Sequence, residues 1–340
     1  MAHSTTLALG VDRAFNGVAA MMAATIGRGN SNNDRLRVLV CLAAYQGMQW
    51  LPEQVDSILA QQGVEVTLLV SIDPSTDGTQ AWFEALAAQR DNVHLLPTQQ
   101  RFGCAAANFF RLLRDADVPA YDLISLADQD DIWLPDKLLR AAAYLEQHPE
   151  VDAYSSNVLA FWPDGRQRLV RKAQPQVSWD HLFEAPGPGC TFVMRSEPVS
   201  RLQHYCSEHE RTLGEVVSHD WFIYAWFRAQ GLKWFIDPEP GLRYRQHDSN
   251  ELGMNRGLAA YRSRLNKVLK GEWFAQAALI ARLTDVEKEP FVRQWISLRP
   301  AGFFYLALRP HLCRRRWRDR LAFSMLCLLR CFVTRRSGRV

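Results

Sequence analysis

The sequence predicts an α/β fold, with a mixed, mostly parallel sheet and helices packed on both of its faces. The main observation is that apolar runs of strand length alternate with helical patterns over roughly 120 residues, from 35 to 150. Such alternation is typical of parallel strands joined by crossover helices. The second observation is that Asp73 and Asp128 each end one of these runs. Because ligands bind beyond the carboxyl ends of parallel strands, both side chains are expected to point into one crevice.

The alternating elements follow one another in a regular order. Continuous apolar runs rich in β-branched residues predict strands over 35–45, 64–73, 92–98 and 121–128. Apolar residues at helical spacing predict helices over 51–63, 76–90, 103–116 and 134–149. Thr76 and Asp77 are candidate caps of the second helix, and Pro135 and Asp136 open the fourth.

The pattern is mixed after residue 150. Residues 151–162 with the turn "PDGR" predict a strand and hairpin, "GPGCTFVMR" (187–195) a glycine-led strand, and "SHDWFIYAWFRAQG" (218–231) an apolar helix. Residues 232–247 predict a strand pair or an extended segment. Beyond about residue 258 the pattern predicts amphipathic helices that become rich in arginine.

These patterns divide the chain into three parts. Residues 1–34 lack the basic start and compact apolar block of a secretory signal, and they predict a loosely ordered N-terminal extension. Residues 35–257 are the predicted catalytic domain, and residues 258–340 a basic amphipathic helical extension.

Charge is unevenly distributed along the chain. The net charge is +4, but residues 299–340 contain eleven arginines and one acid, so the preceding 298 residues carry a net charge of −6. An acidic body with a basic, apolar tail does not indicate a nucleic-acid partner; it suggests a globule held to an anionic surface. The seven cysteines are scattered without a CxxC pair, which favours reduced thiols in the cytoplasm over disulfides or a zinc site.

Three carboxylates crowd into the stretch "SLADQDDIWLPDKLL" (125–139), at Asp128, Asp130 and Asp131. Like charges so close together repel one another, so folding alone gives no reason to group them. A positively charged group is therefore expected to sit between them. The alternative is an Asp-rich turn that ends in a helix cap.

Seven segments together resemble family 2 glycosyltransferases of the GT-A fold, and most closely the bacterial rhamnosyltransferases that build O-antigen and related polysaccharides. In the family's order, these are "LAAYQGMQWLPEQVDSILAQ", "VSIDPSTDGT", "RFGCAAANF", "SLADQDDIWLPDKL", "GCTFVMR", "SHDWF" and "YRQHDSN". The resemblance covers about residues 36–255. It implies a nucleotide-diphospho-sugar transferase fold with a Rossmann-like sheet.

The resemblance also implies a nucleotide-sugar donor site. Asp73 matches the family position that hydrogen-bonds the base, and the other matched donor positions are Tyr45, Glu53, Arg101 and Asn108. The chain departs from the family where Gln46 replaces the usual asparagine and where "IDPS" replaces Asp-Asp-Gly-Ser. These departures concern recognition of the base and leave the acidic cluster unaffected.

A metal site follows from the donor chemistry. The departing diphosphate calls for a divalent cation, and Mg²⁺ usually takes one or two carboxylates while keeping waters and phosphate oxygens. Asp130 is the main predicted ligand of Mg²⁺ or Mn²⁺, and Asp128 shares the metal or holds the ribose. Asp131 is expected to position the loop. His247 matches a late family histidine that completes the metal or diphosphate site; a structural histidine is the alternative.

Asp220 in "SHDWF" matches the family's catalytic base. A sugar hydroxyl is a poor nucleophile until its proton leaves, so transfer with inversion at the anomeric carbon needs such a base. The alternative is that Asp220 caps the helix that follows, with Ser218 as a rival cap.

The C-terminal stretch 301–332 contains two apolar segments around an arginine cluster. The longer segment, 321–329, is well short of the roughly 20 residues that cross a bilayer. Arginines on one face and Phe, Leu and Met on the other suit a helix lying in the membrane interface. The alternative is a helical pair packed on the domain, with its arginines in solvent.

The predicted activity is transfer of a sugar, most plausibly L-rhamnose from dTDP-L-rhamnose, to a growing lipid-linked glycan at the inner face of the cytoplasmic membrane. A UDP-hexose donor stays open. A nucleotidyltransferase would carry a glycine-rich basic phosphate loop near its N-terminus, and residues 36–50 contain none. A non-catalytic membrane scaffold would not need Asp128, Asp130 and Asp220.

Overall fold

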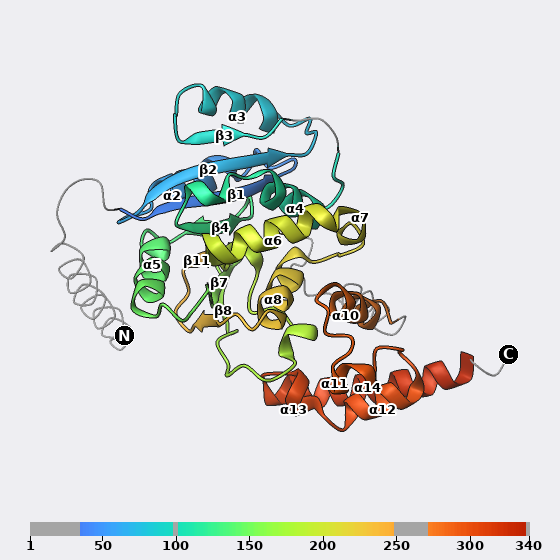
Figure 1. The fold of residues 1–340 in the computed structure, drawn as a ribbon. Coiled ribbons are helices and arrows are strands. Elements are labelled where there is room, and N and C mark those ends of the chain that lie inside the picture. The colour runs from blue at the N-terminus through green and yellow to red at the C-terminus, as the bar shows by residue number, and fades with distance from the viewer. Residues whose placement is uncertain (1–34, 98–100, 248–270, 338–340) are drawn as a thin grey trace, which may run out of the picture. The chain divides into compact units, whose positions relative to one another are not determined.

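The computed structural model describes residues 35–97, 101–247 and 271–337 (Figure 1). The chain divides into two compact units, Met1–Leu36 and Arg37–Val340, and the elements below belong to the second unit. The predicted N-terminal extension and the predicted boundary near residue 258 lie outside the described residues.

The larger sheet has seven strands in the order β10-β6-β9-β4-β1-β2-β3. Strand β1 pairs in parallel with β2 on one side and β4 on the other, while β9 runs antiparallel between β4 and β6. The strands are β1 (Arg37–Ala44), β2 (Glu65–Ile72), β3 (Val93–Leu95), β4 (Leu123–Ala127), β6 (Ala153–Ser156), β9 (Val193–Arg195) and β10 (Trp234–Asp237).

Both faces of the sheet are covered, as the sequence predicts. Leu39 and Cys41 of β1 share the main hydrophobic cluster with Phe109 of α4 (Ala105–Asp115). Val38 and Val40 are also fully buried, and strand alternation places them on the opposite face. The remaining helices of this half are α2 (Leu51–Leu59), α3 (Thr79–Ala87), α5 (Lys137–Gln147) and the 3₁₀ turn η1 (Val118–Ala120).

A second sheet has four strands, all of which follow β4 in the sequence, in the order β5-β11-β7-β8. Its strands are β5 (Ile132–Trp133), β7 (Val158–Phe161), β8 (Gln167–Val170) and β11 (Leu242–Arg245). The pairing of Arg243 with Ile132 brings the late strand β11 against the loop that follows β4. This pairing builds one wall of the candidate site.

One predicted strand is in fact two. The apolar run 151–162 divides at Asn157 into β6, in the large sheet, and β7, in the small sheet. The Asn157 side chain donates to the Pro238 carbonyl (2.6 Å) and accepts the backbone N–H of Ala173 (3.0 Å). These bonds to distant loops redirect the chain, and hydrophobicity alone carries no sign of them.

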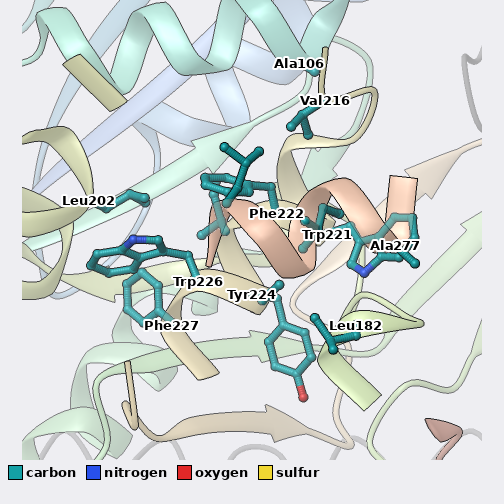
Figure 2. Close-up of a cluster of buried hydrophobic side chains, with 14 of the residues drawn as sticks. Ala106, Leu182, Leu202, Val216, Trp221, Phe222, Tyr224, Trp226, Phe227 and Ala277 are labelled. Carbon is teal, nitrogen blue, oxygen red and sulfur yellow. The ribbon is translucent and has the colours of Figure 1, made fainter. Parts of the chain in front are cut away.

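The helix α8 (His219–Ala229) lies at the centre of the main hydrophobic cluster (Figure 2). It packs against α4, α10 (Glu272–Leu283) and the 3₁₀ turn η2 (Asp180–Leu182). The side chains of Trp221, Phe222 and Trp226 are therefore buried on several sides of the helix. The neighbouring helices α6 (Ser196–Glu208) and α7 (Glu210–Leu213) complete this layer.

The described C-terminal helices share the same core. They are α10, α11 (Pro290–Arg293), α12 (Pro300–Ala307), α13 (Pro310–Cys313) and α14 (Trp317–Ser337). Phe274 of α10, Phe303 of α12 and Phe323 of α14 belong to one cluster with the side chains of α8. The C-terminal helices are therefore part of the globule that holds the candidate site.

A buried ionic network joins these helices to η2. The Asp180 carboxylate accepts hydrogen bonds from Tyr224 Oη (2.9 Å), Arg228 Nη1 (3.0 Å) and Arg315 Nη1 (3.0 Å). The side chains of Asp180 and Arg315 are both completely buried. Arg315 also donates to the Ala185 carbonyl (2.7 Å). Arg315, one of the arginines of the C-terminal cluster, is thus an internal structural residue. The alternative of a helical pair packed on the domain predicts arginines in solvent instead.

Candidate active site

The candidate site lies where β1, β2 and β4 end at the same edge of the large sheet. Ala44 pairs with Ile72, and Leu42 pairs with Ala127. The residues that follow these three strands, Tyr45, Asp73 and Asp128, are therefore neighbours at that edge. The sequence predicts this meeting of Asp73 and Asp128 at one edge of the sheet.

Asp73 organises the loop in front of α4. Its side chain is almost fully buried, and its two carboxylate oxygens accept the backbone N–H groups of Phe102 and Gly103, each at 3.0 Å. Its own N–H donates to the Ala44 carbonyl (2.9 Å). A carboxylate has about four acceptor positions, so one that holds two N–H groups keeps capacity for another donor.

Two of the other predicted donor residues lie side by side. Tyr45 is 42% exposed, and Arg101 Nη2 lies 3.5 Å from its hydroxyl. Glu53 instead forms an ion pair with Arg245 of β11. Asn108 is buried between α4 and β2, where it donates to the Ser71 carbonyl (3.2 Å). The structure therefore brings Tyr45, Asp73 and Arg101 together and places Asn108 behind them, in the interior.

The predicted metal residues Asp130 and His247 are in direct contact. His247 Nε2 lies 2.7 Å from Asp130 Oδ2, and the imidazole ring stacks on Trp50 with the ring centroids 4.1 Å apart. The Asp130 backbone carbonyl accepts a hydrogen bond from Arg245 Nε (2.8 Å). The strand β11 therefore carries His247 to the acidic loop.

Asp128 is half-buried and forms a close cluster with two residues that were not predicted as ligands. One ligand atom each of Asp128, Asp131 and Cys190 lies within 4.8 Å of the others. Burial, together with the charges of Asp130 and Asp128, raises the pKa of Asp131 well above its usual value. Asp131 Oδ1 accepts the Arg245 N–H (3.2 Å), while its buried Oδ2 has no hydrogen-bond partner among the described residues.

The donor set suits a hard divalent cation. Carboxylate oxygens are the preferred ligands of Mg²⁺ and Mn²⁺, and Asp131, whose Oδ2 has no hydrogen-bond partner among the described residues, clusters with Asp128. Of the three predicted ligands, only Asp128 belongs to the cluster with Asp131 and Cys190, while Asp130 and His247 pair with each other. Asp131 and Cys190 are the buried members of the cluster.

A buried lysine, Lys137, lies close to Asp131 and Cys190. Lys137 Nζ is 3.4 Å from the centroid of the Trp133 ring and 3.2 Å from Ser125 Oγ. Burial lowers the Lys137 pKa to about 7, against the opposing effect of Cys190 and Asp131. Sequence spacing gives no signal for Lys137 or Cys190, because both reach the cluster only through the packing of α5 and the 3₁₀ turn η3 (Gly189–Thr191).

Asp220 lies in the first turn of α8 and is half-buried. Its Oδ1 accepts the backbone N–H of Trp221 (2.7 Å) and the hydroxyl of Ser218. Ser218 is the N-cap residue of α8 and makes no capping hydrogen bond with its side chain, and the backbone N–H that Asp220 bonds is only that of the next residue, so neither predicted side-chain cap forms. Among the described residues both hydrogen bonds of the Asp220 carboxylate fall on Oδ1, which leaves Oδ2 available to another donor.

The turn η3 links Asp220 to the acidic cluster. A Cβ atom placed on Gly189 would lie 2.5 Å from His219 Nε2 and 3.5 Å from Asp220 Cβ. The next residue, Cys190, has its Sγ within 4.8 Å of carboxylate oxygens of Asp128 and Asp131, so η3 lies between Asp220 and the acidic cluster. Burial lowers the pKa of His219 to about 4, so this neighbour of Asp220 is neutral at pH 7.

Comparison with known proteins supports the family. The model of glycosyl transferase family 2 matches residues 39–235. The dTDP-rhamnosyl transferase RfbG of Shigella flexneri is 34% identical over 293 residues, which cover 86% of this chain and 100% of the relative. The putative glycosyltransferase EpsE of Bacillus subtilis strain 168 is 30% identical over 182 residues, 52% of this chain and 62% of the relative.

Solved structures show the same fold at low sequence identity. The mannosyltransferase PcManGT from Pyrobaculum calidifontis, in complex with GDP-Man and Mn²⁺, is 16% identical with a TM-score of 0.51, covering 98% of this chain and 99% of that one. S. aureus TarS 1-349 is 14% identical with a TM-score of 0.51, covering 89% and 92%. The predicted GT-A fold is thereby confirmed, and the chain belongs to glycosyl transferase family 2, so it is a glycosyltransferase.

Proposed function

We propose that this glycosyltransferase is metal-dependent and inverting, and that it transfers L-rhamnose from dTDP-L-rhamnose to a growing lipid-linked glycan such as an O-antigen. The observation that supports the proposal is that two consecutive residues of η3 adjoin both parts of the site: Gly189 lies beside Asp220, and Cys190 lies near Asp128 and Asp131. The donor is proposed because a relative named as a dTDP-rhamnosyl transferase aligns over its entire length.

Tyr45, Asp73 and Arg101 are proposed to hold the nucleotide. Asp73 has acceptor capacity for the ring N–H of thymine, and the exposed Tyr45 ring offers a surface for stacking. Arg101, with its guanidinium 5.5 Å from the centroid of that ring, is positioned to neutralise phosphate. Glu53 and Asn108 act indirectly in this scheme, through Arg245 and through the anchoring of α4.

Asp128 and Asp130 are proposed to hold the donor diphosphate through Mg²⁺ or Mn²⁺. A bound cation would stabilise the negative charge of the departing diphosphate. His247 is proposed to complete this part of the site, because its Nε2 already lies 2.7 Å from Asp130 Oδ2. The ring stacking on Trp50 holds the imidazole in one orientation.

Asp220 is proposed to act as the general base. Two hydrogen bonds hold its Oδ1 at the start of α8, while Oδ2 takes the proton from the acceptor hydroxyl. As that proton leaves, the acceptor oxygen attacks the anomeric carbon from the side opposite the diphosphate, and the configuration inverts.

An enzyme with a lipid-linked acceptor acts at a membrane surface. We propose that this surface is the inner face of the cytoplasmic membrane. The arginine-rich C-terminal region would bind its anionic lipids. No helix within residues 35–97, 101–247 and 271–337 is long and apolar enough to span a bilayer.

A donor screen tests the proposal. Purified protein with Mn²⁺ would be offered dTDP-L-rhamnose, UDP-glucose, UDP-galactose and UDP-N-acetylglucosamine, with release of the free nucleoside diphosphate as the readout. We expect turnover of dTDP-L-rhamnose that is lost in Asp130→Asn and on chelation of the metal. Turnover of a UDP-sugar alone would overturn the proposed donor, and full turnover in EDTA would overturn the metal dependence.

A further inference from the structure

The helix α14 is apolar on two opposite sides. One side packs into the core, where Phe323 and Cys327 are buried. The other side faces solvent at a helical spacing of four and three residues. We call it the outer face of α14, and its members, with their exposed fractions, are Trp317 (64%), Leu321 (61%), Met325 (62%), Leu329 (48%) and Phe332 (65%).

Such a helix differs from the amphipathic helix that the sequence predicts. Arginines on one side and apolar residues on the other would let the apolar side pack on the domain and the charged side meet water. In the structure only one of the two apolar sides of α14 packs against the core. A contiguous exposed apolar strip of this length marks an interaction surface.

The neighbouring charges indicate the chemistry of the partner. Arg315 is buried against Asp180, and Arg314 is engaged by Glu184 and the Phe183 carbonyl, so both serve the interior. Arg316 and Arg318, on either side of Trp317, are exposed. Exposed arginines beside a tryptophan and a strip of aliphatic side chains complement an anionic lipid surface.

We infer that the outer face of α14 docks on an anionic bilayer, with the helix axis in the plane of the membrane. The inference rests on the proposed function in one respect, since a lipid-linked acceptor would lie at the same surface. The buried pair of Asp180 and Arg315 ties α13 and α14 to η2, so docking would hold the catalytic globule at a set orientation to the membrane.

Vesicle sedimentation tests this inference without any sugar substrate. Full-length protein would be spun with vesicles of phosphatidylcholine alone or with one third phosphatidylglycerol. We expect about tenfold more bound protein on the anionic vesicles, and loss of that binding in the double variant Leu321→Glu/Met325→Glu. Leu169→Glu, on the exposed surface of β8, is the matched control and should bind like the unaltered protein.

Three results would overturn the inference: no binding to anionic vesicles, equal binding by the double variant, or a concentration-dependent dimer that the double variant abolishes. The last would assign the outer face to a second copy of the chain. Nucleoside diphosphate release in the donor screen is measured without vesicles, so a failure of the proposed transferase activity is distinguishable from a failure of docking.

A second inference rests on different contacts, at Gln129 in the middle of the acidic motif. Its Oε1 accepts the Tyr45 N–H (2.8 Å), and its Nε2 donates to the Tyr45 carbonyl (2.9 Å). The side-chain amide thus pairs with the backbone of Tyr45 as a neighbouring strand would. A Cβ placed on Gly47 would lie 2.4 Å from Gln129 Oε1, so glycine at 47 makes room for the pair.

The geometry points to Gln129 as a positioning residue for the nucleotide. Tyr45 follows β1 and lacks a strand partner of its own, while Asp128 and Asp130 flank Gln129 on either side. The amide pair therefore ties the exposed tyrosine to the carboxylates proposed to hold the diphosphate. A change in either part of the donor site would be transmitted to the other.

The test compares Gln129→Met, which keeps the length and loses both bonds, with Gln129→Glu, which keeps one acceptor. Losing two such bonds is expected to raise both the donor KM and the Kd for dTDP without cation by about tenfold, with kcat within about twofold. The values for Gln129→Glu should fall between those of the unaltered protein and of Gln129→Met. Gln89→Met, at an exposed position just after α3, should leave both constants unchanged. A lower melting temperature with an unaltered Kd for dTDP would show a structural role alone and overturn the inference.

Discussion

His247 Nε2 lies 2.7 Å from Asp130 Oδ2, although the two residues are 117 positions apart. The contact depends on β11, whose backbone pairs with β5 directly after the acidic loop. Two side chains from different ends of the domain therefore share one side of the candidate metal site. Its consequences for cation use can be measured.

Replacement of His247 should weaken the cation site without abolishing it. In His247→Gln the carboxylates of Asp128 and Asp130 remain, so the Mn²⁺ concentration for half-maximal turnover is expected to rise about tenfold. Asp130→Asn should lower turnover at least a hundredfold at any Mn²⁺ concentration. The measurement is a Mn²⁺ titration of nucleoside diphosphate release; an unaltered titration curve in His247→Gln would contradict a role for this histidine in the metal site.

Asp220→Asn should separate chemistry from donor binding. Asparagine retains the helix-start hydrogen bond but is not a base, so kcat is expected to fall by about a thousandfold with the Kd for dTDP unchanged. Ser218→Ala removes one of the bonds to Asp220 Oδ1 and should lower kcat by less than about tenfold. A lower melting temperature with an unaltered kcat in Asp220→Asn would instead assign Asp220 a structural role at the start of α8.

Arg315→Met should destabilise the fold although it lies far along the chain from the acidic loop. It removes one partner of a completely buried ion pair and leaves the Asp180 charge with Arg228 alone, at an expected cost of about 3 kcal/mol in the free energy of unfolding. Arg316→Met, at the next and exposed position, should change that free energy by less than about 0.5 kcal/mol. Urea unfolding measures both, and similar values for the two variants would refute the structural role of the buried network.

Acid should destabilise the fold through its buried histidines. Burial lowers the pKa of His219 to about 4 and that of His181 to about 3. An unfolded histidine titrates near 6.5, so between pH 6.5 and about 4 the unfolded chain binds more protons and stability falls as pH falls. Each histidine should cost about 2 kcal/mol between pH 7 and pH 5.

The check is urea unfolding of the unaltered protein and of His181→Gln at both pH values. Glutamine does not titrate, so the variant should lose about 2 kcal/mol less on acidification than the unaltered protein. An identical loss in both proteins would show that His181 is not buried in its neutral form.

Gly47→Ala should disturb the nucleotide site by displacing Gln129. The added methyl would meet Gln129 Oε1, so the Kd for dTDP is expected to rise about fivefold. In the double variant Gly47→Ala/Gln129→Ala the clash with the Gln129 side chain is absent. Its change in the free energy of dTDP binding should therefore be smaller than the sum of the changes in the two single variants. Strict additivity in the binding measurements would mean that the two residues act independently.

The positions that the sequence predicts correctly are those that depend on local order along the chain. Asp73 and Asp128 end apolar runs, and their meeting at one sheet edge follows from the parallel pairing that alternation of strands and helices predicts. The position of Asp220 at the start of α8 is also predictable, since the sequence itself shows a carboxylate in the first turn of an apolar helix. The fold and the family could be predicted for the same reason.

What the sequence left open depends on contacts between distant segments. Cys190 and Lys137 reach the acidic cluster only because η3 and α5 pack beneath it, and Gln129 acquires its role from the backbone of Tyr45, 84 residues earlier. The apolar sides of α14 illustrate the same limit: composition shows arginines and leucines, but the packing of α14 against the core decides which of them remain outside. Strand ends and helix starts can be predicted from neighbouring residues in the sequence. The surroundings of a side chain depend instead on which surfaces pack together when the whole chain folds.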